Sequence, residues 1–300
     1  MTQGLARTPV LHGEGIRLQP SAHVRLLRLA RQKPLGTIAL VIILVMAGLA
    51  VFAGNLVAHA PLEMNARAVL HPPSAEFPLG TDNFGRDIFS RIVYGSRISL
   101  AVGLGSVGLA LAVGVFLGMV SAYFEGRVDT VIQRLMDVAL AFPGIVFALA
   151  ILAALGPGLF NVIIAIAFTM IPRANRIVRG SVLSEKHNMY VDAARSIGCS
   201  QRRIMWQHIF PNVTAPIIII AATELGAAIL LEASLSFLGV GVPPPNPSWG
   251  GMLSGAHRTF MLAAPWMAVF PGIAISLSVL GWNLLGDALR DVWDPRLRGR

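Results

Sequence analysis

The fold class is decided by residues 98–124, ISLAVGLGSVGLALAVGVFLGMVSAYF, a stretch without a charged side chain. A helix needs roughly 20 apolar residues to cross about 30 Å of hydrocarbon, and this stretch exceeds that length. Three other uncharged stretches are also long enough: Pro34–Leu62, Val138–Pro172 and Thr259–Gly286. Only 13% of the 300 residues are charged, whereas a soluble domain has roughly 25%. The sequence therefore predicts an all-α, polytopic membrane protein.

Six transmembrane helices are expected, at residues 36–59, 98–122, 132–155, 159–178, 213–238 and 264–286. The run 138–172 is too long for one span, and Gly156-Pro157-Gly158 divides it between two helices. The inner end of the second helix must run past Arg173, Arg176 and Arg179, whose side chains can snorkel toward water.

The basic residues predict the orientation of these spans. With a cytoplasmic N-terminus, all but five of the 24 lysines and arginines fall on the cytoplasmic side, the exceptions being Arg67, Arg86, Arg91, Arg97 and Arg258. Such asymmetry is the positive-inside bias. The net charge of +9 therefore reflects how the spans are oriented in the membrane, and nucleic acid is not an expected partner. The predicted order is a cytoplasmic tail at 1–33, a first transmembrane helix at 34–60, an extracytoplasmic loop at 61–97, a five-helix core at 98–287 and a cytoplasmic tail at 288–300.

Residues 85–100 have helical periodicity within the outer loop. Apolar side chains fall on one face, and Asp87 and Arg91 are four residues apart on the other, where they can pair. The pattern predicts an interfacial helix that turns into the second span. The alternative is an ordinary loop.

Two motifs limit what the chain can do with nucleotides. Gly103, Gly105 and Gly108 match G-x-G-x-x-G, but that fingerprint needs a strand-turn-helix in water. Inside a span, small residues instead let helices approach closely. Neither Lys33 nor Lys186 follows a glycine, so the chain has no P-loop. If transport is driven by ATP, the ATPase must be another chain.

Cysteine and histidine usage does not predict a metal centre. Cys199 is the single cysteine, and it is expected as a reduced, incidental thiol in the cytoplasm. The histidines lack paired ligand spacing, although His59, His71 and His257 could face outside together and make a transient metal contact.

Glu224 and Glu232 lie in or near the fifth span. A carboxylate at the centre of a bilayer costs about 2.5–3.5 kcal/mol and normally faces a polar interior or a partner. Both are candidates for the translocation path, unless Glu224 is protonated and hydrogen-bonded locally. Glu232 could anchor the following proline-rich segment, Gly239–Trp249, which is expected to be extended. That segment could cover the pore, meet a partner or serve as a plain loop.

The loop at 190–212, YVDAARSIGCSQRRIMWQHIFPN, is more structured than a connection between spans requires. Val191–Ile197 can form two helical turns, and Gly198 can end them in the left-handed conformation. A second helix is expected at Gln201–Phe210, stopped by Pro211. Ala193 and Ala194 lack bulk, so a partner could approach one face closely.

This loop resembles the cytoplasmic coupling loop of bacterial ABC-importer permeases, E-A-A, three residues, G, about nine residues, then I-x-L-P. Asp192 replaces the glutamate, and Phe210 replaces a common leucine. Three more segments are similar to signatures of dipeptide, oligopeptide and nickel permeases, and indicate the C-type of their two permease subunits: Pro78–Asp87 with Tyr94–Leu100, Glu232–Gly250, and Asn283–Leu297.

The resemblance implies a type I ABC importer permease fold, with a coupling loop at 180–212. The residues implied in coupling to an ATPase are Val191, Asp192, Ala193, Ala194, Arg195, Ser196, Ile197, Gly198 and Pro211. The implied family signature is Gly80, Thr81, Asp82, Gly85, Arg86 and Asp87. The implied partners are membrane lipid, a homologous second permease, two cytoplasmic ATPases that bind ATP and Mg, and an extracytoplasmic solute-binding protein.

The chain itself is then expected to be a non-catalytic, multi-pass subunit of a bacterial inner membrane, without a cofactor. Its cargo is left open among dipeptides, oligopeptides, nickel and glutathione-like peptides. A rival hypothesis is a stand-alone secondary transporter or channel that uses Glu224 as an ion or proton relay.

Overall fold

The computed structural model describes residues 34–254, 260 and 262–293. Within these ranges the regular structure is helical, apart from one bridge between Thr81 and Asp87. Five helical runs are long and apolar enough to span a membrane, and one bent pair of helices would make a sixth. The prediction of an all-α chain with about six spans is confirmed. The expected tail at 1–33, the end of the C-terminal tail and His257 lie outside the described residues.

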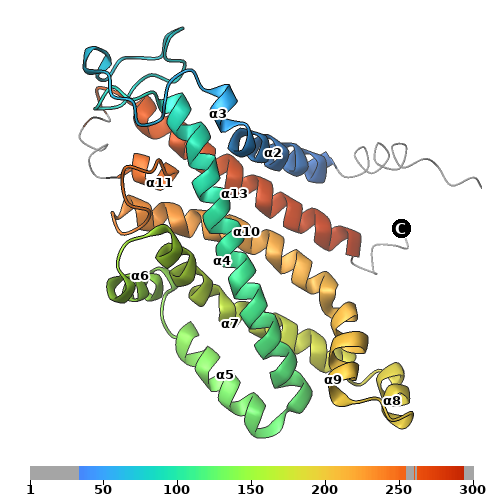
Figure 1. Ribbon diagram of the computed structural model, residues 1–300. Coiled ribbons are helices and arrows are strands. Elements are labelled where there is room, and N and C mark those ends of the chain that lie inside the picture. Colours follow the sequence, from blue (N-terminus) through green and yellow to red (C-terminus); the bar gives the residue numbers. More distant parts are fainter. Residues whose placement is uncertain (1–33, 255–259, 261, 294–300) are drawn as a thin grey trace, which may run out of the picture. The chain divides into compact units, whose positions relative to one another are not determined.

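The spanning helices are α2 (Pro34–Val51), α4 (Ile88–Phe124), α7 (Leu159–Glu185), α10 (Thr214–Phe237) and α13 (Trp266–Trp293), shown in Figure 1. Shorter elements are α3 (Ala53–Leu56), η1 (Ala66–Ala68) and α11 (Trp249–Met252). As expected, α7 continues past Arg179, with Pro172 inside it.

Helix α4 is one unbroken helix of 37 residues. The prediction that an interfacial helix turns into a separate second span is therefore wrong. Asp87 is the N-cap, and its carboxylate accepts hydrogen bonds from the backbone N–H groups of Phe89 (3.3 Å) and Ser90 (2.9 Å). Arg91 was expected to pair with Asp87. Its Nε instead lies 3.7 Å from Oδ2 of Asp82.

The expected third span at 132–155 is not one helix. It consists of α5 (Gly126–Leu140) and α6 (Gly144–Leu155), whose axes differ by 94°. The break falls where Pro143 precedes the first residue of α6. Proline has no N–H group for a helical hydrogen bond and clashes with the preceding turn. Figure 1 shows α5 and α6 as two separate helices.

The helix expected to stop at Pro211 continues instead. After α9 (Gln201–Arg203), a π-helical stretch η2 (Ile204–Ile209) and a 3₁₀ turn η3 (Phe210–Val213) lead directly into α10. Proline is tolerated in membrane helices when such local adjustments satisfy the freed carbonyl groups. The loop at 190–212 is thus joined to α10 without a break in the helical run Gln201–Phe237.

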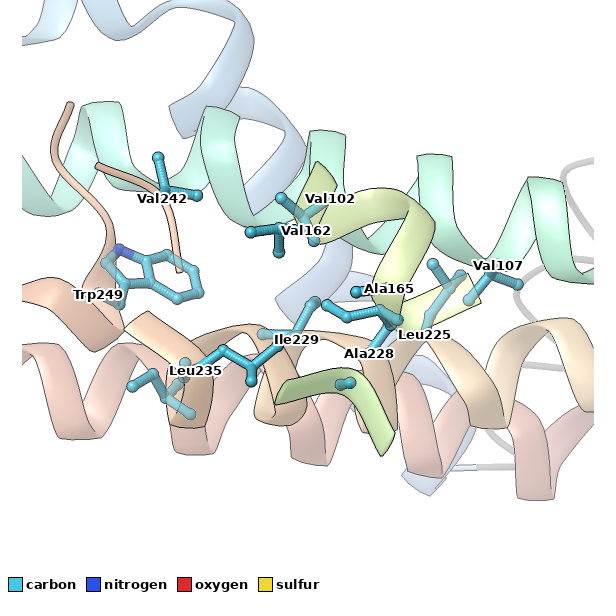
Figure 2. Packing of buried hydrophobic residues seen from close by; sticks show 14 of the residues in the cluster. Val102, Val107, Val162, Ala165, Leu225, Ala228, Ile229, Leu235, Val242 and Trp249 are labelled. Carbon is cyan, nitrogen blue, oxygen red and sulfur yellow. The ribbon is translucent and has the colours of Figure 1, made fainter. Parts of the chain in front are cut away.

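The core lies where α4, α7 and α10 meet, and Figure 2 shows Val102, Val162 and Ile229 packed there. A methyl group added at Gly103 would lie 3.3 Å from Ile229, and one at Gly226 would lie 3.3 Å from the Val279 carbonyl of α13. Gly114 and Gly118 similarly face the backbone of α7. The G-x-G-x-x-G match therefore lies within a helix, as predicted, and its Gly103 and Gly105 allow close packing against Ile229 and Ile163, whereas Gly108 meets no atom within 4 Å.

The proline-rich segment 239–249 forms turns and contains a cis Pro244–Pro245 peptide bond, so the expected extended conformation is wrong. Val242 and Trp249 are buried, and the Trp249 indole N–H donates to the Ile92 carbonyl of α4 (3.0 Å). These contacts turn the segment back onto the helices.

Candidate functional site

The segment Val191–Ile197 folds largely as predicted, within helix α8 (Met189–Ser196). Its inner face carries Val191 and Ala194, which are buried in a second apolar cluster. That cluster includes Met119 from the end of α4, Val182 from α7 and Ile204 from η2. Helix α8 is thereby held against the ends of two spanning helices.

Gly198 ends α8 as the sequence predicts. Its φ is +78°, the left-handed region that glycine adopts without a steric penalty. The backbone N–H of Cys199 donates to the Ala194 carbonyl (3.0 Å), and that of Gly198 donates to the Arg195 carbonyl (3.0 Å). This pair of hydrogen bonds is a Schellman motif. It reverses the chain so that Ser200 can cap the next helix.

Tyr190 connects α8 to both neighbouring segments. Its hydroxyl donates to Oε2 of Glu185 (2.8 Å) and accepts from Nδ2 of Asn212 (3.1 Å). Burial and then the Glu185 hydrogen bond raise the pKa of Tyr190, so the phenol keeps its proton. The tyrosine therefore fixes α8 relative to the end of α7 and the η3 turn that precedes α10.

The outer face of α8 is exposed and partly apolar. The exposed fraction is 88% for Met189 and 81% for Ile197. Asp192 and Arg195 form an exposed ion pair beside them (3.1 Å). The two alanines differ, because Ala194 packs inside the chain and Ala193 faces out. The sequence reasoning missed Met189, although an apolar residue at the first position of a solvated helix was visible.

A polar cluster ties the turn between α4 and α5 to α7. Lys186 Nζ donates to the Tyr123 carbonyl (2.9 Å) and lies 2.8 Å from Oε1 of Glu125. The Lys186 hydrogen bond lowers the pKa of Glu125. Arg179 makes two hydrogen bonds to Asp129, of 2.7 and 2.6 Å. The cluster orients α5 along α7.

Glu224 forms an ion pair with Arg173 of α7, with Oε1 and Nη1 3.0 Å apart. The side chain is 8% exposed for Glu224 and 67% exposed for Arg173. Both line a cavity of about 250 Å³ that reaches Phe142 and Gly144 at the break between α5 and α6. A charged partner is thus available to the carboxylate, and the pair faces an open space.

Glu232 is fully buried, and its Oε1 accepts a hydrogen bond from Ser236 Oγ (2.7 Å). Ser236 Oγ in turn accepts from the backbone N–H of Val242 (3.2 Å). The carboxylate therefore anchors the proline-rich segment through Ser236, which agrees with the sequence-based expectation. It does not share the cavity beside Glu224.

The signature Gly80–Asp87 builds the start of α4. Asp82 accepts from the Arg86 backbone N–H (3.0 Å) and from Arg86 Nε (2.7 Å), while the Thr81 hydroxyl donates to the Ala68 carbonyl. A side chain at Gly85 would collide with the backbone of Asn65. These residues shape the loop before α4, and they are distant in sequence from α8 and Glu224.

Comparison with known proteins agrees with this geometry. Residues 114–299 match the family model described as binding-protein-dependent transport system inner membrane component. The chain is 45% identical to the dipeptide transport system permease protein DppC of Alkalihalophilus pseudofirmus, over 89% of this chain and 88% of that protein. It is 47% identical to the glutathione transport system permease protein GsiD of Pectobacterium atrosepticum, over 75% of each.

Solved structures share the fold at low sequence identity. The MetNI methionine ABC transporter in an inward-facing conformation matches with a TM-score of 0.56 and 16% identity, over 67% of this chain and 96% of that one. The family depends on a binding protein, which argues against the stand-alone transporter or channel. Its members are non-catalytic membrane subunits that work with separate ATPases. This chain therefore belongs to the family of binding-protein-dependent transport system inner membrane components.

Proposed function

We propose that this chain forms half of the translocation pathway of an ATP-driven peptide importer in a bacterial inner membrane. Its partners are a homologous second permease, two cytoplasmic ATPases that bind ATP and Mg, and an extracytoplasmic solute-binding protein. The observation that carries the proposal is the exposed apolar face of α8 on an internally anchored helix. The names of the similar proteins, which include dipeptide and glutathione permeases, support peptides as the cargo.

The proposed mechanism uses α8 as the contact that transmits movement. Met189 and Ile197 insert into a groove of the ATPase, as the apolar face of a docked helix does. Val191 and Ala194 fasten α8 to the ends of α4 and α7, so closure of the ATPases shifts those ends. The spans then alternate between inward-facing and outward-facing arrangements, and Arg173 and Glu224 line the path. The residues of this chain perform no covalent chemistry.

Met189→Asp tests the docking step. An ionised aspartate in a buried apolar contact is strongly unfavourable, so ATPase association in purified membranes should fall at least tenfold and uptake should stop. Met64→Asp is the matched control, since Met64 is also exposed but lies before α4. Its ATPase association should stay at the wild-type level. Wild-type association of the Met189→Asp variant would refute the docking role.

Reconstitution tests the cargo and the need for partners. A labelled dipeptide should enter proteoliposomes only when ATP, the ATPases, the second permease and the binding protein are all present. Uptake by this chain alone would instead support the secondary transporter or channel.

A further inference from the structure

The cavity beside Glu224 holds one charge of each sign. Arg173 and Glu224 both line it, and their side chains are in contact, with Nη1 and Oε1 3.0 Å apart. The Glu224 side chain is 8% exposed, whereas that of Arg173 is 67% exposed. The carboxylate is therefore fixed by its surroundings, while the guanidinium can swing away from it within the cavity. The proposed mechanism places this pair on the path but does not say what the charges bind.

The break between α5 and α6 adds a second feature that suits an anion. Helix α6 begins at Gly144, which lines the cavity, and a glycine can line a cavity only with backbone atoms. The first N–H groups of a helix have no partner within it, and Pro143 has no side-chain group that could cap them. The positive end of the α6 dipole therefore lies at the same cavity as the Arg173 guanidinium. Discontinuous transmembrane helices direct such ends at the anionic groups of a substrate.

A ligand that carries both charges can exchange partners with the ion pair. Separation of Arg173 from Glu224 alone leaves two unpaired charges, which is strongly unfavourable away from water. A carboxylate on Arg173 and an ammonium group on Glu224 replace the lost ion pair with two new ones. A ligand with a single charged end leaves one of the two side chains unpaired. The cavity therefore favours a zwitterion, and the loss of the internal pair keeps its binding reversible, as passage along a path requires.

The size and the walls of the cavity favour a short peptide. Pockets for drug-sized ligands measure about 300–1,000 Å³, and this cavity is smaller, at about 250 Å³. Two residues of extended chain span at most about 7 Å, a separation that the long, exposed arginine can accommodate. Apolar walls that can contact the side chains of a peptide are Phe142, Phe147, Met170 and Leu231. A dipeptide therefore fits better than a longer chain.

We propose that this cavity is a cargo-binding site that recognises both charged ends of a dipeptide. The peptide carboxylate binds Arg173 beside the start of α6, and the peptide ammonium group binds Glu224. The inference rests on the proposed function, since it names the chemistry by which the transport path of this chain selects its cargo. Blocking either end of the peptide removes one of the two new ion pairs.

The test measures binding of alanyl-alanine to the complete complex that this chain forms in its native membrane, purified in detergent and freed of the binding protein. Saturation-transfer difference NMR gives the Kd of the free dipeptide, of its N-acetyl form and of its C-terminal amide. Each blocked form should bind at least about tenfold more weakly than the free dipeptide, as expected for the loss of a hydrogen bond between charged groups. Equal binding of the three forms, or no saturable binding of the free dipeptide, would overturn the proposal.

Two variants assign the ends of the peptide. Glu224→Gln should abolish the preference for the free dipeptide over its N-acetyl form, and Arg173→Gln should abolish the preference over the amide. Asp137→Asn and Arg176→Gln are the matched controls, because this ion pair (2.6 Å) also involves α7 but lies outside the cavity. Both controls should keep the wild-type preferences.

The ratio of the Kd values separates recognition from a structural role. If the Arg173–Glu224 pair only holds the helices together, either variant weakens all three forms alike, and that result or unchanged preferences would overturn the proposal. Arg173→Lys keeps a positive charge and should keep a preference for the free carboxylate.

Uptake distinguishes a failure of this inference from a failure of the proposed function. If alanyl-alanine enters proteoliposomes with ATP and all partners present, while both cavity variants keep the wild-type preferences, the inference fails and the proposed function stands. If the wild type takes up no alanyl-alanine under those conditions, peptide import itself is refuted.

Discussion

A methyl group at Gly118 should force α4 and α7 apart. The added Cβ would lie 2.8 Å from the carbonyl oxygen of Asn175, 3.0 Å from Val178 Cβ and 3.2 Å from the backbone nitrogen of Arg179. These atoms belong to the backbone of α7 or are fixed to it, so rotation of a side chain cannot relieve the contact. The backbones of α4 and α7 must therefore move apart at this contact.

The size of the effect follows from two opposed contributions. Overpacking of a close contact costs about 1–3 kcal/mol. Replacement of a helical glycine by alanine favours the helix by about 1 kcal/mol. Gly108→Ala on the same helix isolates the second contribution, because a Cβ there meets no atom within 4 Å. Gly118→Ala should therefore be less stable than Gly108→Ala by about 1–3 kcal/mol.

Unfolding of the purified protein in mixed micelles of increasing SDS content measures this difference directly. Both variants should unfold cooperatively, and only the Gly118→Ala midpoint should shift to lower SDS. The reasoning is refuted if Gly118→Ala unfolds at the same SDS fraction as Gly108→Ala, since the close approach of α4 and α7 would then carry no packing cost.

The remaining predictions concern the polar cluster around the α4–α5 turn. Asp129→Asn should destabilise the protein by about 1.5–3 kcal/mol, because it removes the negative charge and one of the two oxygens that accept from Arg179, at a side chain that is only 18% exposed. Asp137→Asn should cost less than about 1 kcal/mol, because that pair is 53% and 47% exposed; equal losses in the same SDS assay would contradict this. The lowered pKa of Glu125 favours the folded state above the ordinary glutamate pKa, and this contribution disappears as the pH falls through the lowered value. Acidification should therefore destabilise the wild type more than Glu125→Gln in thermal unfolding, and parallel pH profiles would exclude the effect.

Local sequence patterns predicted most of the helices and the shape of α8. The length of an apolar run, and a glycine that can end a helix, depend only on residues close together in the sequence. Gly198 is the clearest case, since its expected left-handed conformation is present. The break at Pro143 was also visible in the sequence Phe142-Pro143-Gly144, but the apolar run around it suggested one span. Pro211 was expected to end a helix, but the helical run continues past it. The π-helical and 3₁₀ turns around Pro211 accommodate the missing hydrogen bond.

Long-range partners could not be predicted in this way. Arg179 and Asp129 are 50 residues apart, and Arg173 and Glu224 are 51 apart. Their pairing depends on how far α7 is rotated against α5 and α10, and the backbone glycines and apolar side chains of the core set that rotation. The sequence identified Glu224 as unusual, whereas its partner became evident only from the packing.

The helical run Gln201–Phe237 also acts as a lever with unequal arms. Gly226 is one of its close approaches to α13, since a methyl group there would lie 3.3 Å from the Val279 carbonyl oxygen, and it is taken as the pivot. At 1.5 Å per residue, Ile204 lies about 33 Å from that pivot and Glu224 only about 3 Å. A sideways shift of about 5 Å at the loop would therefore move the backbone at Glu224 by about 0.5 Å. Large swings beside α8 thus leave the Arg173–Glu224 pair almost in place, so the cavity there can keep its charges while the far end of the helix moves.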